Sequence, residues 1–489
     1  MSVDLLRQIA HYEKISRQLD PDHEQRSAWG QAGLEHVLMF LQNIKGRKMF
    51  WLGPDQAKKV LDYTPPDKGI ELEEVLQLIH EELDEKGLKA SSGGHMAYIP
   101  GGGLFPSGLA DLIAAICNYY SGAFYVAPGA VRIENILIRW VGEMIGYDPK
   151  ICQGNLSSGG SYAGLIAMHT AREHLKISSR DIPQTVIYLS QQTHHALEKA
   201  LKVIGMKEAI YRKVPMDEDF RMIPGELEAL IQEDLAKGLK PAILIGSMGT
   251  TDVGAVDPLD KLADISEKYG LWFHADAAYG GFFMLLEEFK QKYPGLSRTD
   301  SMVIDPHKGL FMPWGTGMVV VREGKKLLNT FASDAAYLQD LIEDDIEYSP
   351  SDLSPELTRH FRGLRVWLPL QLFGVDSFKA ALREKLLLTQ YAFHRFQQME
   401  GIELPLHPQL TVILFRSLAP VEDTNAFNQN LIKAILEDGR IFISSTKIDG
   451  KIYLRLTILH FRTHLEEVKL FFDILETQRQ SLLAQDKAD

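Results

Sequence analysis

The sequence predicts an α/β protein in which helices cover a mostly parallel central sheet. From about residue 105 to 375, short apolar runs alternate with helical patterns, as in proteins built on a parallel sheet. The runs are continuous in Val, Ile and Leu, which indicates strands buried on both faces. The patterns differ on either side, so we predict a helical N-terminal arm at 1–104, a large α/β domain at 105–375 and a small α+β domain at 376–489.

The N-terminal arm contains an amphipathic helical pattern. An isolated arm cannot bury an apolar stripe, so we expect this one to pack on another lobe or to form a dimer with a partner subunit. The stripe lies in GLEHVLMFLQNI and consists of Leu34, Val37, Leu38, Leu41 and Ile44.

The middle region contains the predicted strands of the central sheet. They are TVIYLS (185–190), AILIGSM (242–248), LWFHAD (271–276), SMVIDP (301–306) and GMVVVRE (317–323). In parallel sheets, ligands bind beyond the carboxyl ends of the strands. Asp276, His307 and Lys308 follow such ends, so we expect a binding site there.

The small C-terminal domain is predicted from a change of pattern. A long helix, SFKAALREKLLLTQYAFHRFQQM, leads to the strand-like runs TVILFR, IFISS and IYLRLTIL, and an amphipathic helix follows Thr463.

Composition excludes several classes of partner. The formal net charge of -13 disfavours nucleic acid and anionic membranes. The chain has no apolar run of about eighteen residues, and MSVDLLRQIAHYEK lacks the apolar core of a signal peptide, so we expect a cytoplasmic protein. Cys117 and Cys152 provide neither a disulfide framework nor a cysteine metal cluster.

Two stretches could hold a phosphate group. In NLSSGGSYAGLIAMHTAREH (155–174), small residues lead into a helical pattern, and a glycine-rich helix start binds anions. In GSMGTTDVGAVDPL, Gly249, Thr250 and Thr251 follow a predicted strand. Taken alone, each stretch is explained equally well or better by an ordinary loop.

Three further side chains carry possible chemistry. Asp276 ends an apolar strand, where a carboxylate is costly unless a cation or proton donor pairs with it. His194, in LSQQTHHALEKA (189–200), stands at a helix start, where a histidine is more often a cap or a core residue. Lys308 leaves a buried strand in SMVIDPHKGL, and a surface loop would explain it too.

Metal binding is not expected. His194 and His195 are adjacent, so their side chains point apart on a helix. His274 and Asp276 lack a third ligand at suitable spacing.

Together these features meet the needs of pyridoxal 5′-phosphate. That cofactor requires a lysine for a Schiff base, an acid at the ring nitrogen and a phosphate nest, and it benefits from a flat partner over the ring. Lys308, Asp276, the loop 158–161 and His194 can fill these roles.

The sequence resembles the pyridoxal-phosphate-dependent group II amino-acid decarboxylases, which act on aromatic amino acids, histidine and glutamate. The likeness extends from HMAYIPGGGLFPSGLADLIAAI (95–116) to IYLRLTIL (452–459). Its marks are SSGGS (157–161), the histidine of SQQTH at 194, HADAAYGG (274–281) and DPHK (305–308). The resemblance implies an aspartate-aminotransferase-type fold, called fold type I, and a homodimer with the site at the subunit interface.

The resemblance also implies a role for each matching residue. Lys308 forms the Schiff base, Asp276 pairs with the pyridine nitrogen, and the ring lies between His194 and Ala278. Four residues lie at the phosphate and ring: Gly160, Ser161, Thr251 and His307. Tyr98 lines the substrate pocket, and Phe124 and Tyr125 reach in from the partner subunit.

The residue that protonates the intermediate is harder to place. In this family it is usually a tyrosine on a loop before a segment like HFRGLRVWLPLQLFG, and an ungapped alignment puts Pro350 at that position. Tyr348 precedes Pro350 by two residues and is our candidate, while Tyr337 stands at the start of the loop. Members without this tyrosine can divert to oxidative deamination, which gives an aldehyde.

The same loop is acidic, with no Lys or Arg from 337 to 358. A solvated lid explains this, but a lid closed over the substrate would disfavour acidic substrates. With Tyr98 and Phe124, this favours decarboxylation of an aromatic L-amino acid to the amine and CO2. The acidic residues are Asp340, Glu343, Asp344, Asp345, Glu347, Asp352 and Glu356.

Several alternatives remain open. They include an aldehyde synthase, a carbon–carbon lyase, a decarboxylase of acidic or diamino acids, and an aminotransferase that grips the α-carboxylate with Arg455. A non-catalytic binding protein is disfavoured because an unused Asp276 in an apolar site would be destabilising. A dehydrogenase is disfavoured because no G-x-G-x-x-G follows a first strand.

Overall fold

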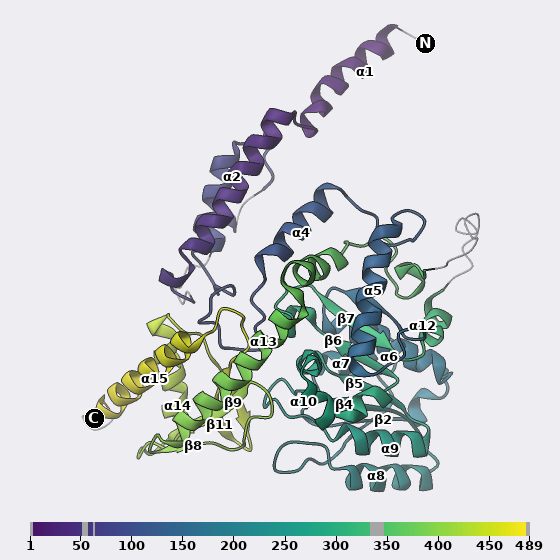
Figure 1. Cartoon of the computed structure of the whole chain (residues 1–489), viewed down its shortest axis with the longest axis vertical. Coiled ribbons are helices and arrows are strands. Elements are labelled where there is room, and N and C mark those ends of the chain that lie inside the picture. Colours follow the sequence, from purple (N-terminus) through teal and green to yellow (C-terminus); the bar gives the residue numbers. More distant parts are fainter. Residues whose placement is uncertain (1–2, 51–56, 62–63, 333–346, 486–489) are drawn as a thin grey trace. The chain divides into compact units, whose positions relative to one another are not determined.

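The computed structural model describes residues 3–50, 57–61, 64–332 and 347–485 (Figure 1). The chain divides into two compact units, Met1–Ser92 and Gly93–Asp489. The finer division into 1–104, 105–375 and 376–489 stays a prediction, although the helix α13 (Gly363–Gln397) has non-helical backbone at Gly374, beside the predicted boundary. In the described part of the chain, no helix is long and apolar enough to cross a membrane.

The first unit consists of helices. They are α1 (Val3–Ser16), α2 (His23–Gln42) and α3 (Leu72–Ile79). Helix α2 begins after Asp22, whose carboxylate accepts a hydrogen bond from the backbone N–H of Gln25 and so caps the helix. Neither α1 nor α2 buries a side chain, and the burial of the apolar stripe against another surface stays a prediction.

A seven-stranded sheet organises the second unit, in the order β1-β7-β6-β5-β4-β2-β3. Strands β6, β5, β4, β2 and β3 pair in parallel, while β7 is antiparallel to both of its neighbours. The strands are β1 (Gln153–Ser157), β2 (Thr185–Leu189), β3 (Ile210–Lys213), β4 (Lys240–Ser247), β5 (Trp272–Asp276), β6 (Ser301–Ile304) and β7 (Gly317–Val321). The predicted mostly parallel α/β architecture is confirmed.

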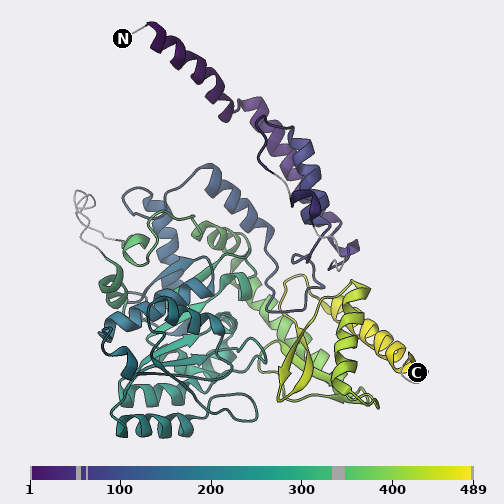
Figure 2. The same cartoon turned by 180° about the vertical axis from the view of Figure 1, so that it is seen from behind.

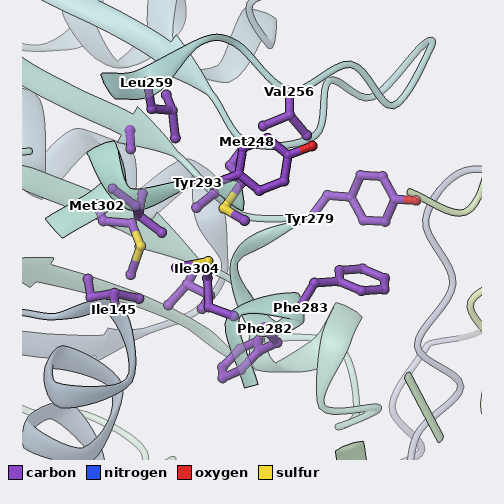
Figure 3. Packing of buried hydrophobic residues seen from close by; sticks show 14 of the residues in the cluster. Ile145, Met248, Val256, Leu259, Tyr279, Phe282, Phe283, Tyr293, Met302 and Ile304 are labelled. Atoms are coloured by element: carbon purple, nitrogen blue, oxygen red, sulfur yellow. The ribbon is translucent and has the colours of Figure 1, made fainter. Parts of the chain in front are cut away.

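Helices cover both faces of this sheet. Alternate residues of β6 enter different clusters: Met302 and Ile304 pack on the side of α5, α8 and α9, and Val303 packs on the side of α6 and α7. Figure 3 shows Met302 and Ile304 near Ile145 of α5. The helices are α4 (Phe105–Ile116), α5 (Pro128–Ile145), α6 (Gly160–His174), α7 (His195–Val203), α8 (Pro224–Ala236), α9 (Leu259–Tyr269), α10 (Glu287–Lys292), α11 (Pro306–Gly309) and α12 (Gly324–Phe331).

A smaller antiparallel sheet follows the kink in α13 (Figure 2). Its strand order is β10-β11-β9-β8, and it packs with α13, α14 and α15. The elements are β8 (Ile402–Glu403), β9 (Val412–Ser417), α14 (Thr424–Asp438), β10 (Ser444–Ile448), β11 (Lys451–Thr457) and α15 (Leu465–Gln485). The predicted small α+β part is therefore present, although β10 begins later than the run IFISS suggested.

A buried ion pair anchors the end of β1. Arg359 Nη1 lies 2.9 Å from Glu134 Oε2, and Arg359 Nη2 donates a hydrogen bond to the carbonyl oxygen of Leu156 at 2.6 Å. Glu134 also accepts a hydrogen bond from the backbone N–H of Gly363. Burial raises the pKa of Glu134 and lowers that of Arg359, and the charge of each residue opposes the shift of the other. Each charge therefore depends on its partner.

Replacing one member of this pair should destabilise the fold. Arg359→Met leaves the buried Glu134 carboxylate without its counter-ion, which costs roughly 3–5 kcal/mol in comparable proteins. We expect the free energy of unfolding, measured in urea, to fall by that order. The matched control is Lys237→Met, which removes an exposed ion pair with Glu233 on α8 and should have little effect. Equal losses in the two variants would contradict this account of the β1 anchor.

Candidate active site

A cavity of about 500 Å³ opens beyond the carboxyl ends of the parallel strands. Its walls come from the segments that follow β1, β2, β4, β5 and β6. All of the predicted cofactor-binding residues line it: Gly160, Ser161, His194, Thr251, Asp276, Ala278, His307 and Lys308. The structure brings these eight residues together, while their roles in binding and catalysis stay proposals.

The start of α6 forms one wall of the cavity. Gly159 precedes the helix with a φ of 146°, a conformation that favours glycine. A Cβ atom on Gly160 would lie 2.8 Å from the carboxylate of Asp305, so this glycine is required by close packing. The first N–H groups of a helix have no partners within the helix, and they attract anions. The α6 start can thus hold a phosphate.

His194 is the N-cap of α7. Its Nδ1 accepts a hydrogen bond from the backbone N–H of Ala196 at 3.3 Å, so the neutral ring carries its proton on Nε2. Burial lowers the pKa of His194, which favours that neutral form. A neutral imidazole held by a helix cap is a suitable flat partner for an aromatic ring. The ring of His195 lies 4.3 Å away, centroid to centroid, so the two side chains do not point apart as expected, because His194 is the N-cap and has extended backbone.

Asp276 ends β5 and presents its carboxylate to the cavity. Its Oδ1 accepts a hydrogen bond from the backbone N–H of Ala278 at 3.2 Å. Burial raises the pKa of Asp276, while the charges of Lys308 and His194 oppose that rise. A protonated ring nitrogen placed against this carboxylate would oppose it further.

Lys308 lies in the helical turn α11, which follows β6. Its Nζ is 3.0 Å from Oδ2 of Asp305, a residue that is only 2% exposed and also lines the cavity. Sequence reasoning missed Asp305 as a site residue, although it opens the motif DPHK. The neighbouring His307 interacts through Nδ1 with the carbonyl oxygen of Thr316 at 2.6 Å, and burial lowers its pKa.

The other predicted site residues do not line this cavity in the described part of the chain. Tyr98 is 58% exposed. Phe124 donates its backbone N–H to Ser349 Oγ, and the carbonyl oxygen of Tyr348 accepts a hydrogen bond from Asn135. Tyr125 is exposed as well, as is Tyr348. Tyr337, Asp340, Glu343, Asp344 and Asp345 lie outside the described residues.

Two of the described acids near Tyr348 are paired with arginine. Glu347 forms an ion pair with Arg139 at 3.0 Å, and Glu356 forms one with Arg362 at 2.8 Å. These charges are partly neutralised, so they contribute less to an acidic field over the cavity than the sequence indicated.

Arg455 is buried and has backbone partners. Its guanidinium donates hydrogen bonds to the carbonyl oxygens of Tyr98, Thr251 and Asp252. These bonds hold the loop of Thr251 against β11. A guanidinium engaged in this way is poorly placed to grip a substrate carboxylate. Among the described residues, no group of three or more His, Cys, Asp and Glu side chains is arranged to hold a metal ion.

Residues 54–418 match the sequence profile described as the pyridoxal-dependent decarboxylase conserved domain. The chain belongs to this family. Along the sequence, the pyridoxal-dependent decarboxylase is 31% identical to an aromatic-L-amino-acid decarboxylase of Bacillus atrophaeus, over 93% of this chain and 95% of the relative. It is 26% identical to a phenylacetaldehyde synthase of Petunia hybrida, over 91% of this chain and 92% of the relative.

Solved structures share the fold of this decarboxylase. A tryptophan decarboxylase of Catharanthus roseus in complex with L-tryptophan superposes with a TM-score of 0.87 at 22% identity, covering 95% of this chain and 99% of that one. A 4-hydroxyphenylacetaldehyde synthase of Rhodiola rosea gives a TM-score of 0.86 at 21% identity, covering 94% and 99%. The predicted aspartate-aminotransferase-type fold, fold type I, is confirmed.

The decarboxylase is a pyridoxal 5′-phosphate-dependent carboxy-lyase, and its cavity fits the cofactor. A lysine, a carboxylate and a helix start suited to phosphate line one space. Two buried polar atoms in this wall, Asp305 Oδ1 and Gln192 Oε1, lack hydrogen-bond partners among the described residues. Unpaired buried polar atoms are destabilising, so these two atoms favour a bound ligand with polar groups.

Replacing Lys308 tests which lysine holds the cofactor. Borohydride treatment of the cofactor-loaded parent should attach the cofactor permanently, and Lys308→Ala should abolish that labelling because the reacting amine is gone. Lys199→Ala is the matched control, since Lys199 also lines the cavity, and it should be labelled like the parent. Mass spectrometry of the treated proteins makes the measurement. Labelled Lys308→Ala protein would show that another amine holds the cofactor.

Proposed function

We propose that this decarboxylase converts an aromatic L-amino acid to its amine and CO2. The proposal is carried by one combination: Lys308, Asp276 and His194 line a single cavity in a chain that is 31% identical to an aromatic-L-amino-acid decarboxylase over nearly its whole length. Decarboxylation of acidic or diamino acids, carbon–carbon cleavage and transamination are the alternatives, and the engaged guanidinium of Arg455 disfavours the last.

Each residue then has a defined task. Pyridoxal 5′-phosphate, when bound, supplies an electron sink for the charge left on the substrate's Cα. Lys308 would hold it covalently, and Asp276 would keep the proton on its ring nitrogen. His194 and Ala278 cover the two faces of the ring, and the α6 start with Ser161 binds the phosphate. The cavity walls would exclude water and fix the orientation of the substrate.

We further propose that the enzyme is a homodimer whose sites are shared between subunits. The support is local: the segment of Phe124 and the segment of Tyr348 are tied together by two hydrogen bonds, Phe124 N–H to Ser349 Oγ and Ser351 N–H to the Gly122 carbonyl oxygen. Because these hydrogen bonds join the two segments, a partner's cavity that receives Tyr348 would also receive Phe124.

Exposed apolar side chains support an interface in the second unit. Helix α4 exposes one nearly continuous row of large apolar residues, which is unusual for a surface that faces water. The row consists of Phe105, Leu109, Leu112, Ile113 and Ile116.

Tyr348 is the proposed proton donor to Cα, and because it does not line its own chain's cavity it would act in the cavity of the partner subunit. If no tyrosine reaches the site, the alternative is oxidative deamination, in which dioxygen is the oxidant and the amino acid gives an aldehyde, CO2, ammonia and hydrogen peroxide. This second reaction is supported by the 26% identity of the chain to the phenylacetaldehyde synthase of Petunia hybrida.

A product assay distinguishes these reactions. We expect the cofactor-loaded enzyme to release CO2 and an amine from phenylalanine, tyrosine or tryptophan, and little from glutamate or from 2,4-diaminobutyrate. Chromatography of the products, with a separate assay for ammonia, makes the measurement. Aldehyde with ammonia would instead establish the aldehyde synthase, and release of CO2 only from the acidic or diamino substrates would overturn the aromatic assignment.

Mixing two inactive variants tests the shared site. Lys308→Ala should make no amine, and Tyr348→Phe should lose most amine formation because the proton donor is absent. In co-expressed chains, each mixed dimer has one site with Lys308 from one subunit and Tyr348 from the other. Random pairing should then restore roughly a quarter of the parent's amine formation.

Amine formation by the co-expressed variants distinguishes a site shared between subunits from a site formed by one subunit alone. If each chain used its own Tyr348, no mixed dimer would hold a complete site, and the co-expressed pair would stay inactive. Light scattering on the purified mixture establishes the dimer and serves as the control for assembly.

A further inference from the structure

Asp305 is a buried charged residue of the cavity that the proposed mechanism leaves without a task. Its carboxylate is 2% exposed and packs against the backbone of Gly160 and Gly317, where a Cβ atom would lie 2.8 Å from it in each case. Oδ2 lies 3.0 Å from Lys308 Nζ, and Oδ1 has no hydrogen-bond partner among the described residues. A buried carboxylate in this position needs a counter-ion.

Lys308 cannot serve that purpose throughout the reaction cycle. As an ammonium group it offers three N–H donors, and one of them can point at Asp305. Once its nitrogen is bonded to the cofactor, at least two of those donors are lost. The cofactor's phosphate then brings further negative charge to the α6 start, which Asp305 contacts through Gly160. Two buried anions side by side repel each other unless a cation lies with them.

His307 is placed to become that cation. The carbonyl oxygen of Thr316 can only accept a hydrogen bond, so Nδ1 of His307 carries a proton. The titrating nitrogen is therefore Nε2, and it lies 3.6 Å from Asp305 Oδ2. The His307 ring also lies next to the α6 start, because its Cε1 is 3.7 Å from the position that a Cβ of Gly159 would take.

The charges around His307 and Asp305 change in one direction when the cofactor binds. Burial and the positive charge of Lys308 lower the pKa of His307 in the cofactor-free chain, and only Asp305 raises it among the charged neighbours. Loss of at least two of the lysine's N–H donors to Asp305 and the arrival of the phosphate's negative charge both favour protonation of His307. Asp276 and His194 are the other titratable groups that interact with Asp305, and both keep their places in the mechanism above.

We propose that Asp305 exchanges one counter-ion for another when the cofactor is loaded. Its carboxylate pairs with Lys308 in the cofactor-free chain, and with a His307 that has taken up a proton from solvent at Nε2 in the loaded enzyme. Asp305 and His307 thus act as a proton-coupled positioning pair beside the phosphate cradle. This inference rests on the cofactor of the proposed function, but not on its substrate or product.

Calorimetry measures the proton directly. Titration of the full-length chain with pyridoxal 5′-phosphate, in two buffers of different ionisation enthalpy at the same pH, gives the number of protons taken up per chain. The His307→Gln chain should take up about one proton fewer than the parent. Asp305→Asn should show the same deficit, because the charge that holds the proton is gone.

His195→Gln is the matched control. His195 is a second histidine of the cavity wall, but the ion pairs of Asp305 do not include it among the described residues, and its uptake should equal that of the parent. Borohydride labelling confirms that Lys308 carries the cofactor in every variant. Uptake equal to the parent in either His307→Gln or Asp305→Asn would overturn the proposal. Because Asn has the shape of Asp, the second variant decides the question if the first does not fold.

The result does not depend on the product assay. A chain that makes aldehyde or accepts glutamate can still show the proton difference, and a chain that makes aromatic amines can lack it. Failure of this inference is therefore distinguishable from failure of the proposed function.

Discussion

The site depends on the pairing of β5 with β6. The two strands run in parallel in a register that sets Asp276 opposite Val303. Both strands end at the same edge of the sheet, so the carboxylate that ends β5 and the turn that follows β6 meet in one cavity. A shift of one residue would turn Asp276 to the other face of the sheet and away from Lys308. Asp276 and Lys308, the acid and the lysine of the proposed mechanism, are brought together by backbone geometry.

Buried polar groups also fix the positions of the loops around the cavity. Arg359 and Arg362 both donate hydrogen bonds to the carbonyl oxygen of Leu156, so the strand that leads into the α6 cradle is fixed from the segment before α13. Arg455 holds the loop of Thr251 in the same manner from the small sheet. Buried cations that bond to carbonyl oxygens position the walls of the site, while Asp276, Asp305 and Lys308 set its charge.

Much of the fold and of the cavity could be predicted from sequence because both depend on short-range patterns. Strands β2, β4, β5, β6 and β7 are continuous apolar runs. Strand β1 was missed because Gln153 and Asn155 break any apolar pattern, and β3 because Ile210–Lys213 is short and only partly buried. Asp305 was missed because its importance lies in contacts with Lys308 and with the backbone of Gly160, and spacing in the sequence does not show such contacts. The acidic segment was interpreted from composition alone, and the pairing of Glu347 with Arg139 reduces its effect.

In the proposed mechanism, Asp276 and Lys308, brought together by the β5–β6 register, drive the loss of CO2 from the substrate. The most direct test measures CO2 release from carboxyl-labelled aromatic amino acids by Asp276→Asn and by the parent, each with the cofactor held by Lys308. An amide cannot keep a proton on the ring nitrogen as a carboxylate does, so we expect release to slow by about 100-fold or more while borohydride labelling of Lys308 persists. Equal rates in the two proteins would contradict the account.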